Sequence, residues 1–367
     1  MKKIFALLLI SLLCLSCGKK EDDVIKLGSI LSLTGGVATY GKEIKDGLEL
    51  AVQNINEQGG IKGKKIEVIY EDDQSTPKGS VNAIQKLISV NKVKVIIGAI
   101  SSSNTLAIAP IAEQSKVVLF SPASSSPKIT HAGDYVFRNY PSDLLEGKEV
   151  ANFALSKKMR TSCIFTINND YGNGLNQVFI EHYEAKGGKV LLNEKYNEGQ
   201  LDFRNSLSKI KGIRPDCVFI VGYGKELGAI VKQAKEIGIN SQFLSTVNFL
   251  DQQTLKIGGT AVNGVIFSSI AFDDKSEDPV IKDFISNFQK MFNRKPNVWS
   301  AHAYDALMII ANVINKGGLP SDQIKKGIYE TQLYHGVSGV TSFDKFGDVI
   351  KTVSFMTVVN NHFVLYK

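Results

Sequence analysis

Two successive series of short apolar runs, each alternating with segments of helical periodicity, constrain the fold of this chain most strongly. Most of the runs are apolar almost without interruption, which is typical of parallel strands that are covered on both faces. Strand–helix alternation therefore predicts an α/β protein, and five strands followed by five predict two Rossmann-like lobes with parallel central sheets. The strand candidates are 25–31, 66–70, 93–99, 117–121 and 135–138, then 163–168, 189–196, 217–222, 242–247 and 264–269.

The chain is predicted to cross between the lobes three times. The segment 139–143 separates the two series and ends at a helix-capping signal, which places the first crossing there. After the tenth strand come helical segments at 278–292, 298–315 and 320–331, and helices without strands of their own must cover an existing lobe. A turn at 343–348 and a strand at 352–359 predict one more crossing. The expected domains, joined by a three-strand hinge, are lobe 1 (24–142 plus 274–343) and lobe 2 (143–273 plus 344–367).

The N-terminus has the pattern of a secretory signal. Lys2 and Lys3 precede an apolar stretch that ends in small residues and is followed by polar residues from Gly18 onward. This stretch is shorter than the roughly 20 residues that a spanning helix needs. We expect residues 1–16 to be removed during export.

The end of this leader, Leu15-Ser16-Cys17, resembles the bacterial lipobox, in which the cysteine is lipidated and becomes the new N-terminus. One position departs from that pattern, because Cys14 stands where leucine is usual. The resemblance implies that lipidated Cys17 and a tether of residues 17–23 hold an exported protein at a membrane, in the periplasm or at the cell surface. The alternative is an ordinary cleaved leader with a free Cys17.

Charge and cysteine content exclude some classes of protein. Removal of residues 1–16 takes away two lysines and leaves a net charge of +5, scattered along the chain, which argues against a nucleic-acid partner. Beyond the leader only Cys163 and Cys217 remain, each near the start of an apolar run. We expect buried free thiols there, with a disulfide as the alternative because export compartments are oxidising and the two strands could be neighbours.

Unusual loops follow several of the predicted strands, at the sheet edge where open parallel sheets bind ligands. The first loop, 31–41, is rich in glycine and is expected to be a flexible lid that carries Tyr40. Serine clusters follow the third and fourth strands, at 101–103 and 124–126. A serine cluster before a helix is often only a cap, but two on neighbouring strand ends favour a carboxylate site, because hydroxyls, free N–H groups and the helix dipole all attract an anion. Lobe 2 supplies loop tyrosines, Tyr171 and Tyr223, beside glycines.

The ordered combination of these motifs resembles the leucine/isoleucine/valine-binding protein family, the type I periplasmic solute-binding proteins of ABC importers. The resemblance covers essentially the whole chain after the leader. It implies a protein that is not an enzyme, needs no cofactor or metal, binds a small carboxylate ligand such as a branched-chain amino acid between its lobes, and delivers it to ABC transporter permease subunits. The segments that carry it are 33–41, 56–61, 71–73, 98–103, 121–122 and 170–172.

The resemblance also implies a set of ligand contacts. Ser102 matches the serine whose hydroxyl meets the ligand carboxylate, and Ser124 and Ser125 match the pair that adds backbone and hydroxyl contacts. The aromatic residues that close over the ligand correspond to Tyr40, Tyr171 and Tyr223.

One position departs from the family pattern. Amino-acid binders of this type carry a glutamate for the ligand's ammonium group where this chain has Val247. An ammonium buried beside valine would be unpaired, at a cost of several kcal/mol. Either another carboxylate substitutes, with Asp170 and Glu226 as nearby candidates, or the ligand has no α-ammonium. Asp305 is expected to be a structural residue near the hinge.

Other functions are less well supported by the sequence. The chain has no His-Glu-x-x-His, Gly-x-Ser-x-Gly or Cys-x-x-Cys motif, and its five histidines are isolated from one another, which argues against an enzyme. A receptor that senses a ligand through the same fold, or a binder of a small amide or a non-amino organic acid, remains an alternative, because fold alone does not determine function.

Overall fold

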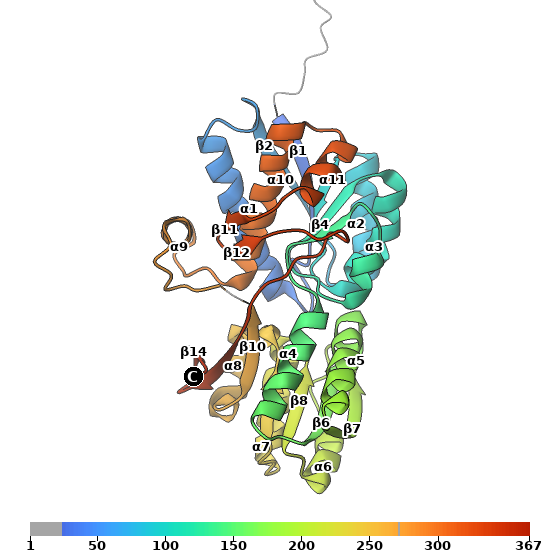
Figure 1. The fold of residues 1–367 in the computed structure, drawn as a ribbon, viewed down its shortest axis with the longest axis vertical. Helices are drawn as coiled ribbons and strands as arrows, with labels where there is room; N and C mark the ends of the chain where they lie inside the picture. Colours follow the sequence, from blue (N-terminus) through green and yellow to red (C-terminus); the bar gives the residue numbers. More distant parts are fainter. Residues whose placement is uncertain (1–23, 271) are drawn as a thin grey trace, which may run out of the picture.

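The computed structural model describes residues 24–270 and 272–367, which form two α/β lobes stacked along the long axis of the molecule (Figure 1). The predicted signal sequence and Cys17 lie outside the described residues. Lobe 1 contains a parallel five-stranded sheet in the order β2-β1-β3-β4-β5. Its short central strands are buried along their whole length, as their continuous apolar sequences predict. The strands are β1 (Val24–Leu31), β2 (Lys65–Asp72), β3 (Val95–Ile97), β4 (Val118–Ser121) and β5 (Val136–Arg138).

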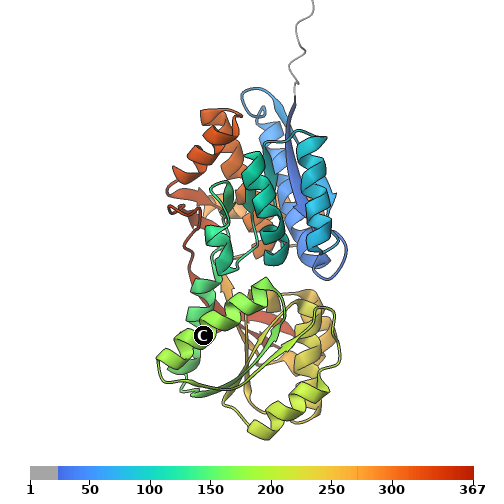
Figure 2. The ribbon, with the colours of Figure 1, turned by 90° about the vertical axis from the view of Figure 1, so that its right-hand side faces the viewer.

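Helices from two distant parts of the sequence cover the sheet of lobe 1 (Figures 1 and 2). The side chain of Thr76 caps one of them by accepting a hydrogen bond from the N–H of Gly79, and Pro77 occupies the first turn. The three late helices predicted after the tenth strand join this lobe, and one of them packs along the first helix. The helices are α1 (Ala38–Glu57), α2 (Pro77–Ser89), α3 (Ser102–Ser115), α9 (Pro279–Phe292), α10 (Val298–Gly317) and α11 (Ser321–Tyr329).

Lobe 2 contains a seven-stranded sheet in the order β14-β13-β10-β9-β8-β6-β7. Five of its strands run parallel, and β13 and β14 extend one edge as antiparallel strands. These findings confirm two lobes with parallel central sheets. The strands are β6 (Thr161–Ile167), β7 (Lys189–Tyr196), β8 (Cys217–Val221), β9 (Gln242–Ser245), β10 (Ile266–Ile270), β13 (Val353–Val359) and β14 (His362–Leu365). The helices are α4 (Asp143–Ser156), α5 (Asp170–Ala185), α6 (Arg204–Ile213), α7 (Gly224–Glu236) and α8 (Gln252–Gly258).

Short elements complete the chain. A hairpin of β11 (Tyr334–Gly336) and β12 (Gly339–Thr341), which the sequence did not predict, precedes the return to lobe 2. The short helical turns are η1 (Pro127–His131), η2 (Val247–Phe249) and η3 (Gly259–Val262).

The connections between the lobes are fastened by buried charges. Arg138, at the end of β5, is fully buried and donates to both carboxylate oxygens of Asp348 on the last connection, at 2.6 and 2.7 Å. Asp305 on α10 accepts hydrogen bonds from the backbone N–H groups of Val337 and Ser338, at 2.9 and 2.7 Å. The contacts of Asp305 are those of a structural residue, because each stabilises the chain just before it returns to lobe 2.

Cys163 on β6 and Cys217 on the neighbouring β8 are both buried and free in this structure. Burial raises the pKa of each thiol to about 11, so both are protonated at neutral pH. Within the described residues no helix is both long and apolar enough to cross a bilayer.

Candidate functional site

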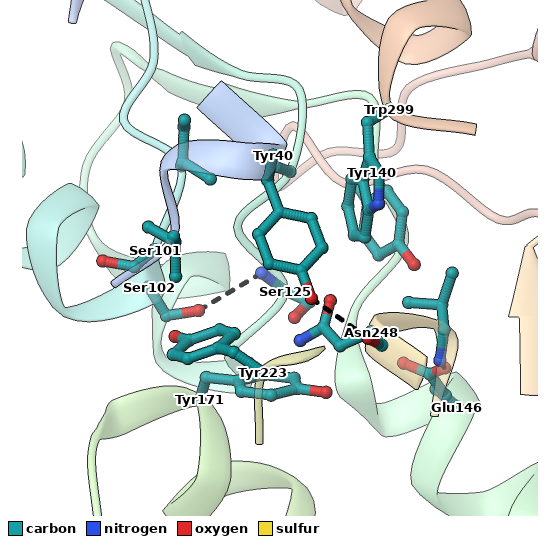
Figure 3. A pocket seen from close by; sticks show the side chains of 14 residues that line it. Tyr40, Ser101, Ser102, Ser125, Tyr140, Glu146, Tyr171, Tyr223, Asn248 and Trp299 are labelled. Carbon is teal, nitrogen blue, oxygen red and sulfur yellow. Dashed lines mark hydrogen bonds between the residues drawn. The ribbon is translucent and has the colours of Figure 1, made fainter. Parts of the chain in front are cut away.

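A pocket lies between the lobes, where loops from the carboxyl ends of both sheets meet (Figure 3). Lobe 1 contributes the segments after β1, β3 and β4, and lobe 2 contributes those after β6, β8 and β9. This is the edge at which parallel sheets bind ligands. The lining residues are Val37, Tyr40, Ile100, Ser101, Ser102, Ala123, Ser125, Tyr140, Glu146, Tyr171, Tyr223, Val247, Asn248 and Trp299.

Ser102 combines a helix N-terminus with a free hydroxyl proton. It is the first residue of α3 and is 2% exposed. Its Oγ accepts hydrogen bonds from the N–H groups of Ser125 and Ser126, at 3.3 and 3.1 Å. Among the described residues nothing accepts the Ser102 hydroxyl proton, which is therefore available to a carboxylate. The first N–H groups of α3 have no partner within the helix and add to the attraction for an anion.

Ser125 lines the same pocket, but Ser124 does not. The Ser124 hydroxyl is directed into lobe 1, where it lies 2.6 Å from the hydroxyl of Thr105 and donates to the carbonyl of Ile100 at 3.0 Å. In this conformation Ser124 supports the loop after β3, and its contact with a ligand stays a prediction.

Tyr40 does not lie on a flexible lid, so that expectation was wrong. Helix α1 begins at Ala38, which places Tyr40 in its first turn with 4% of its surface exposed. Gly41 permits a close approach: a Cβ there would lie 1.9 Å from the carbonyl oxygen of Ser32. The glycine that suggested a mobile loop instead allows the first turn of α1 to lie against the end of β1.

The lobe 2 tyrosines form an aromatic wall opposite the serines (Figure 3). The rings of Tyr171 and Tyr223 stack with centroids 6.0 Å apart, and the Tyr40 ring lies 6.1 Å from that of Tyr223. Tyr171 exchanges a hydrogen bond of 2.7 Å with Thr246, and Tyr223 accepts one of 3.2 Å from Asn169. Burial raises the pKa of all three phenols, so the wall is neutral at physiological pH.

Sequence reasoning did not identify several of the residues that line the pocket, and three of them, Trp299, Tyr140 and Glu146, have unusual surroundings. Trp299, in the first turn of α10, stacks on Tyr140 with centroids 5.2 Å apart. The Trp299 Nε1–H and the Tyr140 hydroxyl are buried and have no hydrogen-bond partner among the described residues. Unpaired buried polar groups are costly, so both are suited to contact a bound molecule. The only sequence signal for Trp299 was its rarity, since the chain has one tryptophan.

Glu146 is the third, and it is 2% exposed in the first turn of α4. Its Oε1 accepts hydrogen bonds from the N–H of Val247 at 3.1 Å and from the hydroxyl of Ser268 at 2.6 Å. Burial raises the pKa of Glu146 to about 6 despite these hydrogen bonds. A usable sequence signal existed: an acidic residue on the same helix face as the buried Val150 and Ala154.

The carboxylates proposed from sequence as substitutes at position 247 lie elsewhere. Asp170 accepts hydrogen bonds from Ser103 at 2.9 Å and from Lys128 at 2.8 Å, both in lobe 1. Glu226, in the first turn of α7, accepts from the N–H of Gly199 at 3.0 Å. Neither lines the pocket. Asp170 links the two lobes, and Glu226 is an acidic residue in the first turn of a helix, where the helix dipole favours negative charge.

Taken together, the lining residues form a pocket suited to binding a small molecule. The described residues include no group of three or more histidine, cysteine, aspartate or glutamate side chains placed to hold a metal ion. The pocket offers hydroxyls, backbone N–H groups and a helix N-terminus on one side, aromatic rings on the other, and one buried carboxylate. Such a set can bind a small polar molecule and exclude water from it.

Comparison with known proteins agrees with this geometry. The leucine-, isoleucine-, valine-, threonine- and alanine-binding protein of Pseudomonas aeruginosa is 28% identical over 330 residues, which cover 89% of this chain and 87% of that protein. The leucine-binding protein LivK of Thermotoga maritima has a TM-score of 0.89 and 30% identity, with 94% of this chain and 98% of that one covered. LivJ, the substrate-binding protein of the branched-chain amino acid transporter of Streptococcus pneumoniae, was solved with isoleucine and has a TM-score of 0.87 and 30% identity over 93% and 97% of the chains.

A family model described as periplasmic binding protein matches residues 24–362, nearly all of the described chain. Fold, pocket position and sequence similarity agree, and we conclude that this chain belongs to the periplasmic binding protein family.

Proposed function

We propose that the protein is the extracytoplasmic solute-binding component of an ABC importer and that it binds a small carboxylate ligand, first of all a branched-chain amino acid, between its lobes. In this proposal lipidated Cys17 holds it at a membrane, and the loaded protein delivers the ligand to permease subunits. Support comes from relatives named as binding proteins for leucine, isoleucine and valine, and from LivJ solved with isoleucine.

The observation that carries the proposal is the placement of Ser102 opposite Tyr171 and Tyr223. The serine and the start of α3 belong to lobe 1, and the tyrosines belong to lobe 2. A ligand whose carboxylate contacts lobe 1 while its body packs on lobe 2 stabilises the closed arrangement of the lobes. Capture by closure is the behaviour that a transport-associated binding protein requires.

A thermal-shift screen followed by calorimetry tests the proposal. Ligands that bind only the folded state raise its stability, by about 2.7 kcal/mol at a concentration 100 times Kd. We expect the melting temperature to rise with leucine, isoleucine or valine, and calorimetry to give one site per chain. If no amino acid and no small carboxylate raises the melting temperature, the proposal is wrong.

Val247 favours a second candidate ligand class. A valine at the position of the usual ammonium-binding glutamate suits an organic acid without an α-amino group, since the side chain of Val247 carries no charge that needs an ammonium partner. The same screen separates the two classes when each amino acid is paired with its deaminated analogue.

A further inference from the structure

Residue 247 has no carboxylate of its own, but a carboxylate from another part of the chain lies beside it. The Val247 side chain is apolar, yet its backbone N–H lies 3.1 Å from Oε1 of Glu146, which is 101 residues earlier in the chain. The carboxylate of Glu146 therefore borders the position from which family members extend their glutamate. Figure 3 shows Glu146 near Asn248 at the edge of the pocket.

Only one of the two carboxylate oxygens of Glu146 accepts hydrogen bonds from the part of the protein that the structure describes. Oε1 accepts both hydrogen bonds, from Val247 and from Ser268, and within the described residues Oε2 has no hydrogen-bond partner. A buried carboxylate that is only partly paired costs free energy, and a cation beside it recovers that cost. No lysine, arginine or histidine lines the pocket, so the described protein supplies no cation there.

We propose that Glu146 binds the ammonium group of an α-amino acid ligand, in the role that a glutamate at position 247 has in the relatives. This inference rests on the proposed function and narrows the ligand class. The serine side of the pocket, in lobe 1, then holds the ligand carboxylate, and Glu146, in lobe 2 and hydrogen-bonded by Ser268, holds the ligand ammonium. A zwitterionic amino acid can make charged contacts with both lobes at once. A simple acid can make them only with lobe 1, through its carboxylate.

Glu146→Gln is the central test, because it removes the charge and keeps the shape. The amide oxygen of glutamine can still accept from Val247 and Ser268, so the fold should be retained, which a melting curve checks. Calorimetry with L-leucine and with its deaminated analogue 4-methylpentanoate should show a loss of leucine affinity of about tenfold to a hundredfold, the effect of one charge-assisted hydrogen bond. Affinity for 4-methylpentanoate should be unchanged or higher.

Glu226→Gln is the matched control. Glu226 is also a buried glutamate in the first turn of a lobe 2 helix, but it does not line the pocket. Its variant should bind leucine as the parent does. In the double variant Glu146→Gln/Val247→Glu the carboxylate returns to the family position, and leucine binding should recover.

The outcomes separate this inference from the function on which it rests. If leucine binds the parent and Glu146→Gln equally well, Glu146 does not hold the ammonium and the inference is wrong, while the proposed function stands. If the parent binds 4-methylpentanoate as tightly as leucine, the inference is also wrong. If the parent binds neither compound nor any other member of the screen, the proposed function itself fails.

Discussion

The phenol of Tyr40 in lobe 1 donates a hydrogen bond of 3.0 Å to the carbonyl oxygen of Asn248 in lobe 2. The phenol oxygen of Tyr40 in turn accepts a hydrogen bond of 3.1 Å from the N–H of Gly224, also in lobe 2. One buried hydroxyl thus joins the two lobes beside the pocket, and the structure represents a closed arrangement. Thr39 adds a neighbouring contact by donating to Asp251 at 2.9 Å.

Tyr40→Phe should weaken this closed state. Two hydrogen bonds are lost at about 1 kcal/mol each, so ligand affinity should fall about tenfold to thirtyfold. Small-angle scattering should show a smaller radius of gyration with ligand than without, and the variant should need more ligand for the same change. A parent radius that does not change at saturation would count against closure.

Ser102→Ala should reduce the affinity for a carboxylate ligand about tenfold to a hundredfold, because one charge-assisted hydrogen bond is removed. The change lies at a helix start rather than in the core, so the fold should survive. Ser89→Ala, exposed at the end of α2, is the control for calorimetry. Equal binding by Ser102→Ala and the parent would mean that the serine clusters are only helix caps.

Leucine binding should weaken as the pH falls through about 6. Burial raises the pKa of ligand-free Glu146 to about 6, and an ammonium partner requires the ionised form, so at pH 5 the affinity should be about tenfold lower than at pH 7. The titratable groups that face Glu146 are Tyr140, Asp143 and Tyr171. Burial raises the pKa of each, which keeps the tyrosines neutral throughout this range.

The stability of the ligand-free protein should depend on pH in the opposite direction and should fall as the pH rises. A glutamate whose pKa is raised on folding contributes stability below its unfolded pKa, and this contribution is lost as the pH rises through about 6. At pH 7 the Glu146→Gln variant should therefore melt above the parent, and the gap should narrow at pH 4.5. Calorimetric titrations and melting curves at four pH values check both effects. An unchanged leucine affinity between pH 7 and pH 5 would contradict the assignment.

Arg138→Met should destabilise the protein by about 3–5 kcal/mol, because it leaves Asp348 partly buried without its partner. Urea denaturation measures the change. The double variant Arg138→Met/Asp348→Leu removes both charges and should recover part of the loss. If the single variant is as stable as the parent, the pair does not fasten the hinge.

Cys17→Ala should release the protein from the membrane fraction, either as soluble exported protein or as uncleaved precursor. Metabolic labelling with a fatty acid should mark the parent and not the variant. Label on the Cys17→Ala protein would show that another residue carries the lipid.

Sequence patterns located the buried parallel strands well, because such strands are apolar on both faces: β8, buried along its whole length, begins at its predicted start, 217, and β6 begins two residues before its predicted start. They missed β14 and the β11–β12 hairpin, which are short and partly exposed and therefore lack that pattern. The start of α1 was misplaced because Gly41 was read as flexible, whereas only the folded structure shows the strand end that it touches.

The candidate site was predictable only in part, for a physical reason. Loops that directly follow strands, such as those of Ser102 and Tyr223, can be placed from strand order alone. Glu146 and Trp299 reach the pocket from helices in other parts of the chain, and no local pattern relates them to it. Long-range contacts of this kind depend on how the two lobes pack, which the sequence does not show directly.

The direction of β1 has a consequence for how a lipid-anchored protein would stand on a bilayer. Because the carboxyl end of β1 leads to the pocket, Val24 begins the strand at the pole of lobe 1 away from lobe 2 (Figure 1). Seven residues extend at most about 25 Å, so an acylated Cys17 would keep that pole close to the lipid headgroups. Lobe 1 would then be the stationary base and lobe 2 the mobile end. Presenting the cleft to a permease would require the whole molecule to tilt toward the bilayer about this single point of attachment.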